Sequence, residues 1–267
     1  MDNPQRQHSR RALLQRGGVI AGWLAVSGLL PGPARAHPRD LFAATSLAAV
    51  VEALDGQTVL ESPDVMLDAP ASVEDGTDVP LACGTTLAAV RSLLLVAPNN
   101  PTALVAVFHP DAAMAADFSL SAKLDQSGPV YAVALTADGS ARFARQQIEV
   151  ALGACSGPMP ADTSVSDAIR IRARLMAGQA LVSALVNHPM ESGRRLDPQG
   201  QSVPTHYIET VQVRHNDRAI LRADWGPWVA RHPILRFQVP GARSGDTIEL
   251  SWQDNRGDSR TERTRLA

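Results

Sequence analysis

Short runs of apolar residues, each separated from the next by turn residues, dominate the first half of the chain. The runs lie at 59–67, 79–83, 93–96, 104–108, 118–123, 130–136 and 143–152, and each fits an extended strand. Pairs such as Asp75-Gly76 and Asp138-Gly139 mark the turns between them. Because a half-buried strand needs a facing sheet to cover its apolar side, these strands predict an antiparallel sandwich of immunoglobulin-like architecture.

A second set of strand patterns follows residue 168. Its runs lie at 169–175, 181–187, 208–215, 219–223, 234–239, 247–253 and 260–266. Asn216-Asp217 and residues 255–257 are suitable hairpin turns. The predicted fold class is therefore all-β, with two immunoglobulin-like antiparallel β-sandwiches at 40–155 and 168–267. Residues 156–167, rich in Ser, Pro, Asp and Ala, form the predicted linker.

The segment 40–54 has a different period from the strands that follow it. Apolar residues recur there at helical spacing from Leu41 to Leu54. Asp40 is a suitable N-cap and Gly56 a suitable stop. The sequence predicts one short helix before the first sandwich.

Residues 1–36 have the pattern of a twin-arginine signal peptide. Arg10 and Arg11 precede an apolar run at 17–30, and Ala34-Arg35-Ala36 supplies a small-x-small cleavage site. The run of 14 residues is shorter than the roughly 20 that a membrane span needs. No later stretch is long and apolar enough to cross a bilayer, so we expect a mature chain without a membrane span, exported to the periplasm.

The charge balance excludes one class of partner. Five of the 25 basic residues and one of the 27 acidic residues lie in the first 36, which leaves 20 bases against 26 acids in the rest of the chain. A surface with this balance does not predict nucleic-acid binding. Lys123 is the only lysine.

Cys155 is the principal candidate for chemistry. It lies between Gly153 and Gly157, after the last predicted strand of the first domain, with Pro158 and Pro160 beyond. Glycine widens the choice of backbone conformations and proline ends a strand ladder, so this setting predicts an exposed arm that presents a thiol. We interpret Cys155 as a covalent attachment site, with Gly153 and Gly157 giving the arm its flexibility.

Cys83 has a different setting. It alternates with Val79 and Leu81, so its side chain is expected to point into the sandwich core as a small apolar filler. A disulfide with Cys155 is the alternative, and it is disfavoured because the two Cα atoms would have to lie within roughly 7 Å.

Three further patterns in the sequence are candidates for a site. Arg170, Arg172 and Arg174 share one face of a predicted strand. The ordinary interpretation is that this face is the solvated outer face of the sheet. The alternative is that these arginines lower the pKa of Cys155 and attract an oxyanion. The segment 225–228, Trp-Gly-Pro-Trp, is expected to cover one end of a sandwich, with partner docking as the alternative. No spacing of the histidines predicts a metal site, and no motif predicts a cofactor or a serine-hydrolase nucleophile.

Taken together, these residues resemble a known pair of proteins. The first domain, ending in the glycine-flanked Cys155, resembles SoxY, the sulfur carrier of the periplasmic thiosulfate-oxidising Sox system. The second domain resembles its partner SoxZ in His188-Pro189-Met190-Glu191-Ser192-Gly193, Val203-Pro204 and Trp252-Gln253-Asp254-Asn255-Arg256-Gly257. Fused chains in this order resemble the SoxYZ-like carriers associated with quinoprotein dehydrogenases.

The resemblance implies a covalent carrier and not an enzyme. In that family a c-type cytochrome joins the arm cysteine oxidatively to thiosulfate, and other enzymes then release sulfate and oxidise the remaining sulfur. The implied partners are a c-type cytochrome or quinoprotein dehydrogenase and other periplasmic sulfur-oxidation enzymes, with a SoxY–SoxZ contact inside the chain. The alternative is a non-covalent adaptor for a periplasmic dehydrogenase or cytochrome, in which Cys155 is incidental.

The arm departs from the family pattern in two respects. The family has Gly-Gly-Cys-Gly-Gly at a free C-terminus, whereas this chain has Gly-Ala-Cys-Ser-Gly at 153–157 and continues into a second domain. A loop enters a narrow tunnel only as a hairpin, which is wider than a single strand. We therefore expect either different partner enzymes or a linker that is nicked after export.

Overall fold

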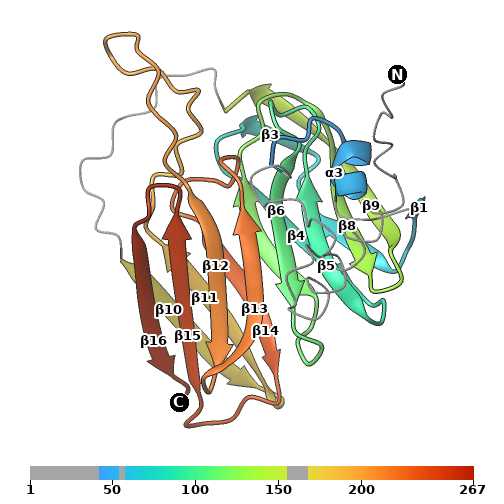
Figure 1. Ribbon diagram of the computed structural model, residues 1–267, viewed down its shortest axis with the longest axis vertical. Helices are drawn as coiled ribbons and strands as arrows, with labels where there is room; N and C mark the ends of the chain where they lie inside the picture. The colour runs from blue at the N-terminus through green and yellow to red at the C-terminus, as the bar shows by residue number, and fades with distance from the viewer. Residues whose placement is uncertain (1–41, 54–57, 155–167) are drawn as a thin grey trace, which may run out of the picture. The chain divides into compact units, whose positions relative to one another are not determined.

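The structure is a computed structural model, and it describes residues 42–53, 58–154 and 168–267 (Figure 1). The predicted signal peptide, Asp40, Gly56, Cys155, Gly157 and the linker lie outside the described residues. No helix among the described residues is long and apolar enough to cross a membrane.

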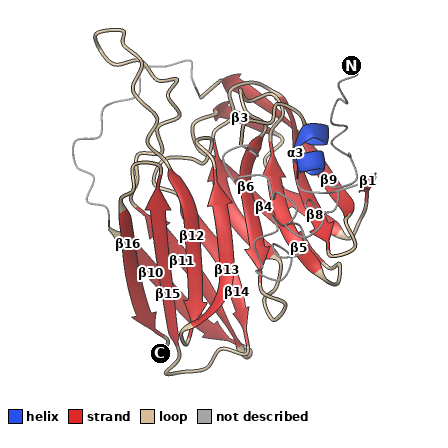
Figure 2. Ribbon diagram, in the orientation of Figure 1, coloured by secondary structure: helices blue, strands red, loops and turns tan. Residues whose placement is uncertain are grey.

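The first half of the described chain contains a helix followed by strands. They are α3 (Leu47–Ala53), β1 (Thr58–Glu61), β2 (Val65–Asp68), β3 (Ser72–Asp75), β4 (Val79–Thr85), β5 (Val90–Val96), β6 (Leu104–Pro110), β7 (Asp117–Ala122), β8 (Gly128–Thr136) and β9 (Ser140–Leu152). The second half continues with β10 (Ile169–Met176), β11 (Gln179–Val186), β12 (Ile208–His215), β13 (Arg218–Trp225), β14 (Ile234–Pro240), β15 (Thr247–Asp254) and β16 (Ser259–Arg265). The all-β prediction is confirmed, with the strands shown in red in Figure 2.

Three local predictions differ from the structure. The run 59–67 is two strands and not one, because a turn at Ser62 interrupts it: the backbone N–H of Val65 donates to the Ser62 carbonyl at 3.2 Å. The helix begins at Leu47 and not near Asp40, since Ser46 caps it by accepting the backbone N–H of Ala49 at 3.1 Å. The short strand β3 was not predicted.

Two sheets face each other, and both run through the two halves of the chain. The ten-stranded sheet has the order β1-β9-β8-β5-β6-β13-β12-β15-β16, with β3 beside β9 off this path. The six-stranded sheet has the order β10-β11-β14-β7-β4-β2. The strands that join the halves are β6 with β13 in the larger sheet and β7 with β14 in the smaller one, and both pairs are antiparallel. We call these two strand pairs the seam.

The immunoglobulin-like sandwich of each half is therefore continuous with that of the other. β1 and β3 depart from the predicted antiparallel pattern, because both pair with β9 in parallel. The main core lies between the two sheets and combines side chains of both halves, such as Phe118 and Leu81 with Phe237 and Trp225. Phe108 and Phe118 stack across this core with ring centroids 4.5 Å apart.

Helix α3 explains a strand that is buried on both faces. Leu93, Leu94, Leu95 and Val96 of β5 are all fully buried, although successive strand residues point to opposite faces. Leu93 and Leu95 belong to the main core, while Leu94 and Val96 belong to a second cluster that includes Val50 and Val51 of α3. The helix thus covers the outer face of the larger sheet (Figure 1).

Candidate functional site

β9 leads directly to the predicted arm. This strand is 13 residues long, and its last residues are held from the side by β3, where Ser72 pairs with Glu149 and Asp75 with Leu152. Gly153 is described and follows the end of β9, whereas Cys155 and Gly157 lie outside the described residues. The structure therefore shows where the arm starts, and the roles of Cys155, Gly153 and Gly157 stay predictions.

The start of the arm is fixed by backbone hydrogen bonds. The N–H of Gly76 donates to the Leu152 carbonyl at 2.8 Å, and the N–H of Ala154 donates to the Leu124 carbonyl at 2.9 Å. A third bond, from the N–H of Leu124 to the Gly76 carbonyl at 2.8 Å, closes the set. We call these five residues, Gly76, Leu124, Leu152, Gly153 and Ala154, the arm root. The chain is hydrogen-bonded on both sides of Gly153, up to the residue before Cys155.

Only glycine fits at position 76. A Cβ atom there would lie 2.2 Å from the Leu124 carbonyl oxygen and 3.2 Å from the Ala154 nitrogen. The side chain of Asp75 stabilises the turn that contains Gly76 by accepting the Thr77 N–H at 2.8 Å. Gly76 was predicted only as part of a turn, and its close contact with the arm root could not be seen from the sequence.

Lys123 connects the arm root to the second half of the chain. Its side chain is buried, and its ammonium donates to the carbonyl of Met190 and, at 3.0 Å, to that of Pro227. Its backbone N–H donates to the Trp228 carbonyl at 2.7 Å. A buried ammonium is costly unless its protons find acceptors, so these carbonyls stabilise the charge in place. The one sequence signal for this role was a single lysine in an arginine-rich chain.

Met190 belongs to a loop supported by two histidines and one carboxylate. Oδ2 of Asp254 accepts from Nε2 of His206 at 2.8 Å and faces Nε2 of His188 at 3.4 Å. Sequence reasoning expected no metal site, but these three groups have possible ligand atoms within 4.8 Å of one another. The Nδ1 atom of His188 accepts the Met190 N–H at 3.1 Å, so Nε2 carries the proton and is not free to bind a metal. The cluster fits a hydrogen-bond network and not a metal centre.

The carboxylate of this network is held in its charged form. Burial alone would raise the pKa of Asp254, but hydrogen bonds from the two imidazoles and from the backbone N–H groups of Arg256 and Asp258 lower this pKa below its usual value. The network therefore stabilises the loop that Lys123 contacts.

Cys83 lies in the core, as predicted. It is 2 % exposed, and it is a free thiol. Burial, and after it the charge of Asp117, raise the pKa of the Cys83 thiol well above its usual value. Because the thiolate is the reactive form, Cys83 is unsuited to carry cargo.

A Ser-His-Asp array crosses the seam. Ser92 Oγ lies 2.9 Å from His109 Nδ1, and His109 Nε2 lies 3.1 Å from Asp224 Oδ2. Ser92 is only 2 % exposed, so a substrate cannot reach its hydroxyl. The array links β5, β6 and β13 as a structural contact, and Arg222 completes it with a 2.9 Å bond to Asp224 Oδ1.

The segment 225–228 is structural, as expected. Trp225 and Trp228 are almost fully buried, and the N–H of Gly226 donates to the Val105 carbonyl at 2.9 Å. A Cβ at Gly226 would lie 2.6 Å from the Phe42 ring. The loop therefore closes against the first half and leaves no aromatic platform for a partner.

Comparison with known proteins identifies both halves. Residues 51–155 match the family model described as "Sulfur oxidation protein SoxY", and residues 169–265 match "Sulphur oxidation protein SoxZ". Among solved structures, the chain is similar to "the sulfur carrier protein SoxY from Chlorobium limicola f thiosulfatophilum", with 21% identity and a TM-score of 0.36 over 39% of this chain and 93% of that chain. No curated protein matches the chain.

Proposed function

Because the chain belongs to the SoxYZ-like proteins, with a SoxY domain followed by a SoxZ domain, we propose that it carries a sulfur-oxidation intermediate covalently on Cys155. The intermediate is derived from thiosulfate. The carrier works in the periplasm after twin-arginine export, and it presents the cargo to a c-type cytochrome or quinoprotein dehydrogenase and to other sulfur-oxidation enzymes.

The arm root is the observation that supports this proposal. The hydrogen-bonded backbone extends to Ala154, and the next residue is the cysteine with which the SoxY match ends. The other cysteine of the chain is buried with a raised pKa. Cys155 is therefore the residue to which a cargo would be attached.

The loading step requires an oxidant. The Cys155 thiolate and the outer sulfur of thiosulfate form an S–S bond and release two electrons, which the cytochrome or dehydrogenase accepts. Water then attacks the sulfonate sulfur; sulfate and two protons leave, and a persulfide stays on the cysteine. A cysteine near its ordinary pKa of about 8.5 is partly thiolate at neutral pH, which suffices for such chemistry.

The chain supplies the attachment point and leaves catalysis to its partners. SoxY and SoxZ domains are carriers or adaptors, which fits a protein that is not an enzyme. The His–Asp groupings of the described residues, around Asp224, Asp246 and Asp254, are held in hydrogen bonds that support the fold.

Replacement of Cys155 by Ser tests the proposal in the native host. We expect Cys155→Ser to abolish the thiosulfate-dependent oxygen uptake that depends on this protein, while Cys83→Ala, the matched control, retains it. Uptake that persists in Cys155→Ser, with partner binding intact, would support the adaptor alternative instead. Periplasmic export is tested separately by replacing Arg10 and Arg11 with Lys and following the protein by cell fractionation.

A further inference from the structure

A row of alternating arginines and serines crosses the outer face of the six-stranded sheet. Strand register places Arg172 of β10 opposite Ser183 of β11, Ser183 opposite Arg236 of β14, and Arg236 opposite Ser119 of β7. Adjacent residues such as Phe237 point into the core, so these four side chains point away from it. The row crosses the seam and takes residues from both domains.

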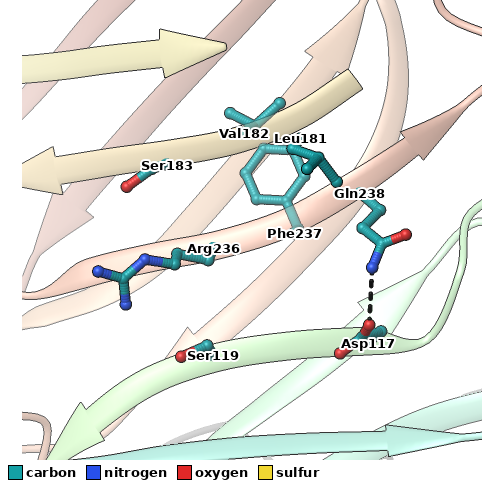
Figure 3. Close-up of a pocket in the computed structure, with 8 residues that line it drawn as sticks. All are labelled: Asp117, Ser119, Leu181, Val182, Ser183, Arg236, Phe237 and Gln238. Atoms are coloured by element: carbon teal, nitrogen blue, oxygen red, sulfur yellow. Dashed lines mark hydrogen bonds between the residues drawn. The ribbon is translucent and has the colours of Figure 1, made fainter. Parts of the chain in front are cut away.

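A hollow of about 250 Å³ lies over three residues of this row, Ser119, Ser183 and Arg236 (Figure 3). It is lined by Asp117, Ser119, Leu181, Val182, Ser183, Arg236, Phe237 and Gln238. Small serines on the two flanking strands leave room beside the longer side chains of β14. One row further along, Gln238 donates from Nε2 to Asp117 Oδ2 at 2.9 Å, which Figure 3 shows as a dashed line.

Arg236, the arginine of the row on β14, has no carboxylate partner among the described residues. Several other arginines are paired with carboxylates, such as Arg195 with Glu191 at 2.6 Å and Arg263 with Glu249 at 2.8 Å. Within the described part of the chain, Arg236 forms no ion pair, although it is exposed. The nearby Asp117 instead accepts the amide of Gln238. Positive charge at the row is therefore left for a ligand or for solvent.

The neighbouring strand strengthens this charge. Arg170, Arg172 and Arg174 of β10 are all exposed on the same face, and none of them forms an ion pair with a described acid. Arg172 lies two strand spacings from Arg236, which is about 10 Å between Cα atoms. Both are long side chains, and only Ser183 stands between them, so the two guanidinium groups can approach one anion.

We propose that this row is a non-covalent binding site for a small tetrahedral sulfur oxyanion, thiosulfate or sulfate. The planar guanidinium of Arg236 matches two oxygens of such an ion, and the hydroxyls of Ser119 and Ser183 donate to the others from either side. The choice of a sulfur oxyanion over phosphate rests on the proposed function, since thiosulfate is loaded onto the carrier and sulfate is released from it. Phosphate shares the geometry and is compared directly in the test.

Titration calorimetry with thiosulfate, sulfate and phosphate at low ionic strength tests the site. The protein is the full mature chain carrying Cys155→Ser, so covalent loading cannot contribute. We expect one saturable site that prefers thiosulfate or sulfate. Arg236→Met should weaken binding roughly tenfold or more, because a hydrogen-bonded charge partner is lost. The double variant Ser119→Ala/Ser183→Ala should weaken it roughly three- to tenfold.

Arg145→Met is the matched control, because Arg145 is an exposed arginine of β9 in the other sheet. Equal weakening by Arg145→Met and Arg236→Met would show general surface attraction and overturn the site, as would the absence of saturable binding by all three ions. Tighter binding of phosphate would overturn the assignment to sulfur oxyanions. Loading of Cys155 is measured separately by mass in the Arg236→Met chain with native Cys155, so failure of this site is distinguishable from failure of the carrier function.

Discussion

The seam and the arm root both join distant parts of the chain, but they are built differently. At the seam, each of the two sheets runs from the first half of the chain into the second. Five residue pairs connect β6 to β13, and two connect β7 to β14. Buried aromatic residues from both sides lie beneath it. The arm root has three backbone hydrogen bonds around Gly76 and Leu124. The side chain of the adjacent Lys123 connects it to the carbonyls of Met190 and Pro227 in the second half.

This difference separates a region held by many contacts from the segment that leads to Cys155. Strand pairing over a shared core distributes its stability over many residues, so no single contact decides it. The arm root depends on a few contacts, and each of them is sensitive to one substitution. The halves are therefore expected to stay together without the linker, whereas the position of the arm is expected to change easily.

The largest expected effect concerns the seam. If residues 37–155 and 168–267 are produced as two separate chains, we expect them to form a stable one-to-one complex, because both sheets and the core cross the boundary. Size-exclusion chromatography with mass determination measures this. A nicked linker would then release a free arm without separating the domains.

Asp224→Ala tests the contribution of the seam to this complex, with Asp217→Ala as its control. It leaves His109 and Arg222 at the seam without their carboxylate, so we expect association to weaken by about 2–4 kcal/mol. Asp217→Ala removes an exposed carboxylate away from the seam and should change association little. Two folded halves that elute separately without any substitution would contradict the role of the seam.

Gly76→Val should disturb the arm root more than any other single change there. The added Cβ would approach the Leu124 carbonyl to 2.2 Å, so the backbone at 124 or 154 must shift. We expect a loss of about 2 kcal/mol in the free energy of unfolding, or roughly 4–8 °C in Tm. Hydrogen exchange should show a faster Ala154 amide. Gly178→Val, at a glycine with open space around it, is the control for size, although its positive φ adds some strain of its own. An Ala154 amide that stays protected in Gly76→Val would argue against the assigned contact.

Lys123→Met should have a smaller effect. It keeps the length of the side chain but leaves the Met190 and Pro227 carbonyls without this donor, at a net cost of about 1 kcal/mol. Thermal unfolding and the rate at which thiosulfate loads Cys155 are the two measurements. Gln126→Ala, an exposed neighbour, is the control and should change neither. If loading and stability were both unchanged in Lys123→Met, the lysine would not support the arm root.

The smallest effect is a pH dependence. The folded-state pKa of Asp254 lies below its unfolded value of about 3.9. Its contribution to stability is therefore complete above that pH and is lost as the pH falls through the lower folded value. In Asp254→Asn, Tm should fall less steeply below about pH 4 than in the unchanged chain. Identical slopes would mean that the network does not hold the carboxylate charged.

The strands were predicted well from the sequence because alternation and turn residues are local signals. The helix start was wrong because Ser46 is a better cap than the pattern suggested, and β3 was missed because Ser72 to Asp75 has one apolar residue. The continuity of the sheets was not predicted, since pairing between β6 and β13 joins residues more than 100 positions apart and leaves no local trace.

The candidate site likewise has a part that could be predicted from the sequence and a part that could not. The glycine-flanked Cys155 and the core position of Cys83 follow from neighbouring residues. The contacts of Gly76 and Lys123 and the meeting of His188, His206 and Asp254 depend on segments brought together only by the fold. Of the row of arginines and serines, the sequence indicated only Arg172, as one of three arginines on one face of β10.

The most direct test of the carrier is the mass of the mature protein taken from cells that are oxidising thiosulfate, with and without reductant, followed by peptide mapping. We predict a reductant-labile sulfur or thiosulfonate adduct on Cys155 and an unmodified Cys83. A bare Cys155 thiol under these conditions would contradict it.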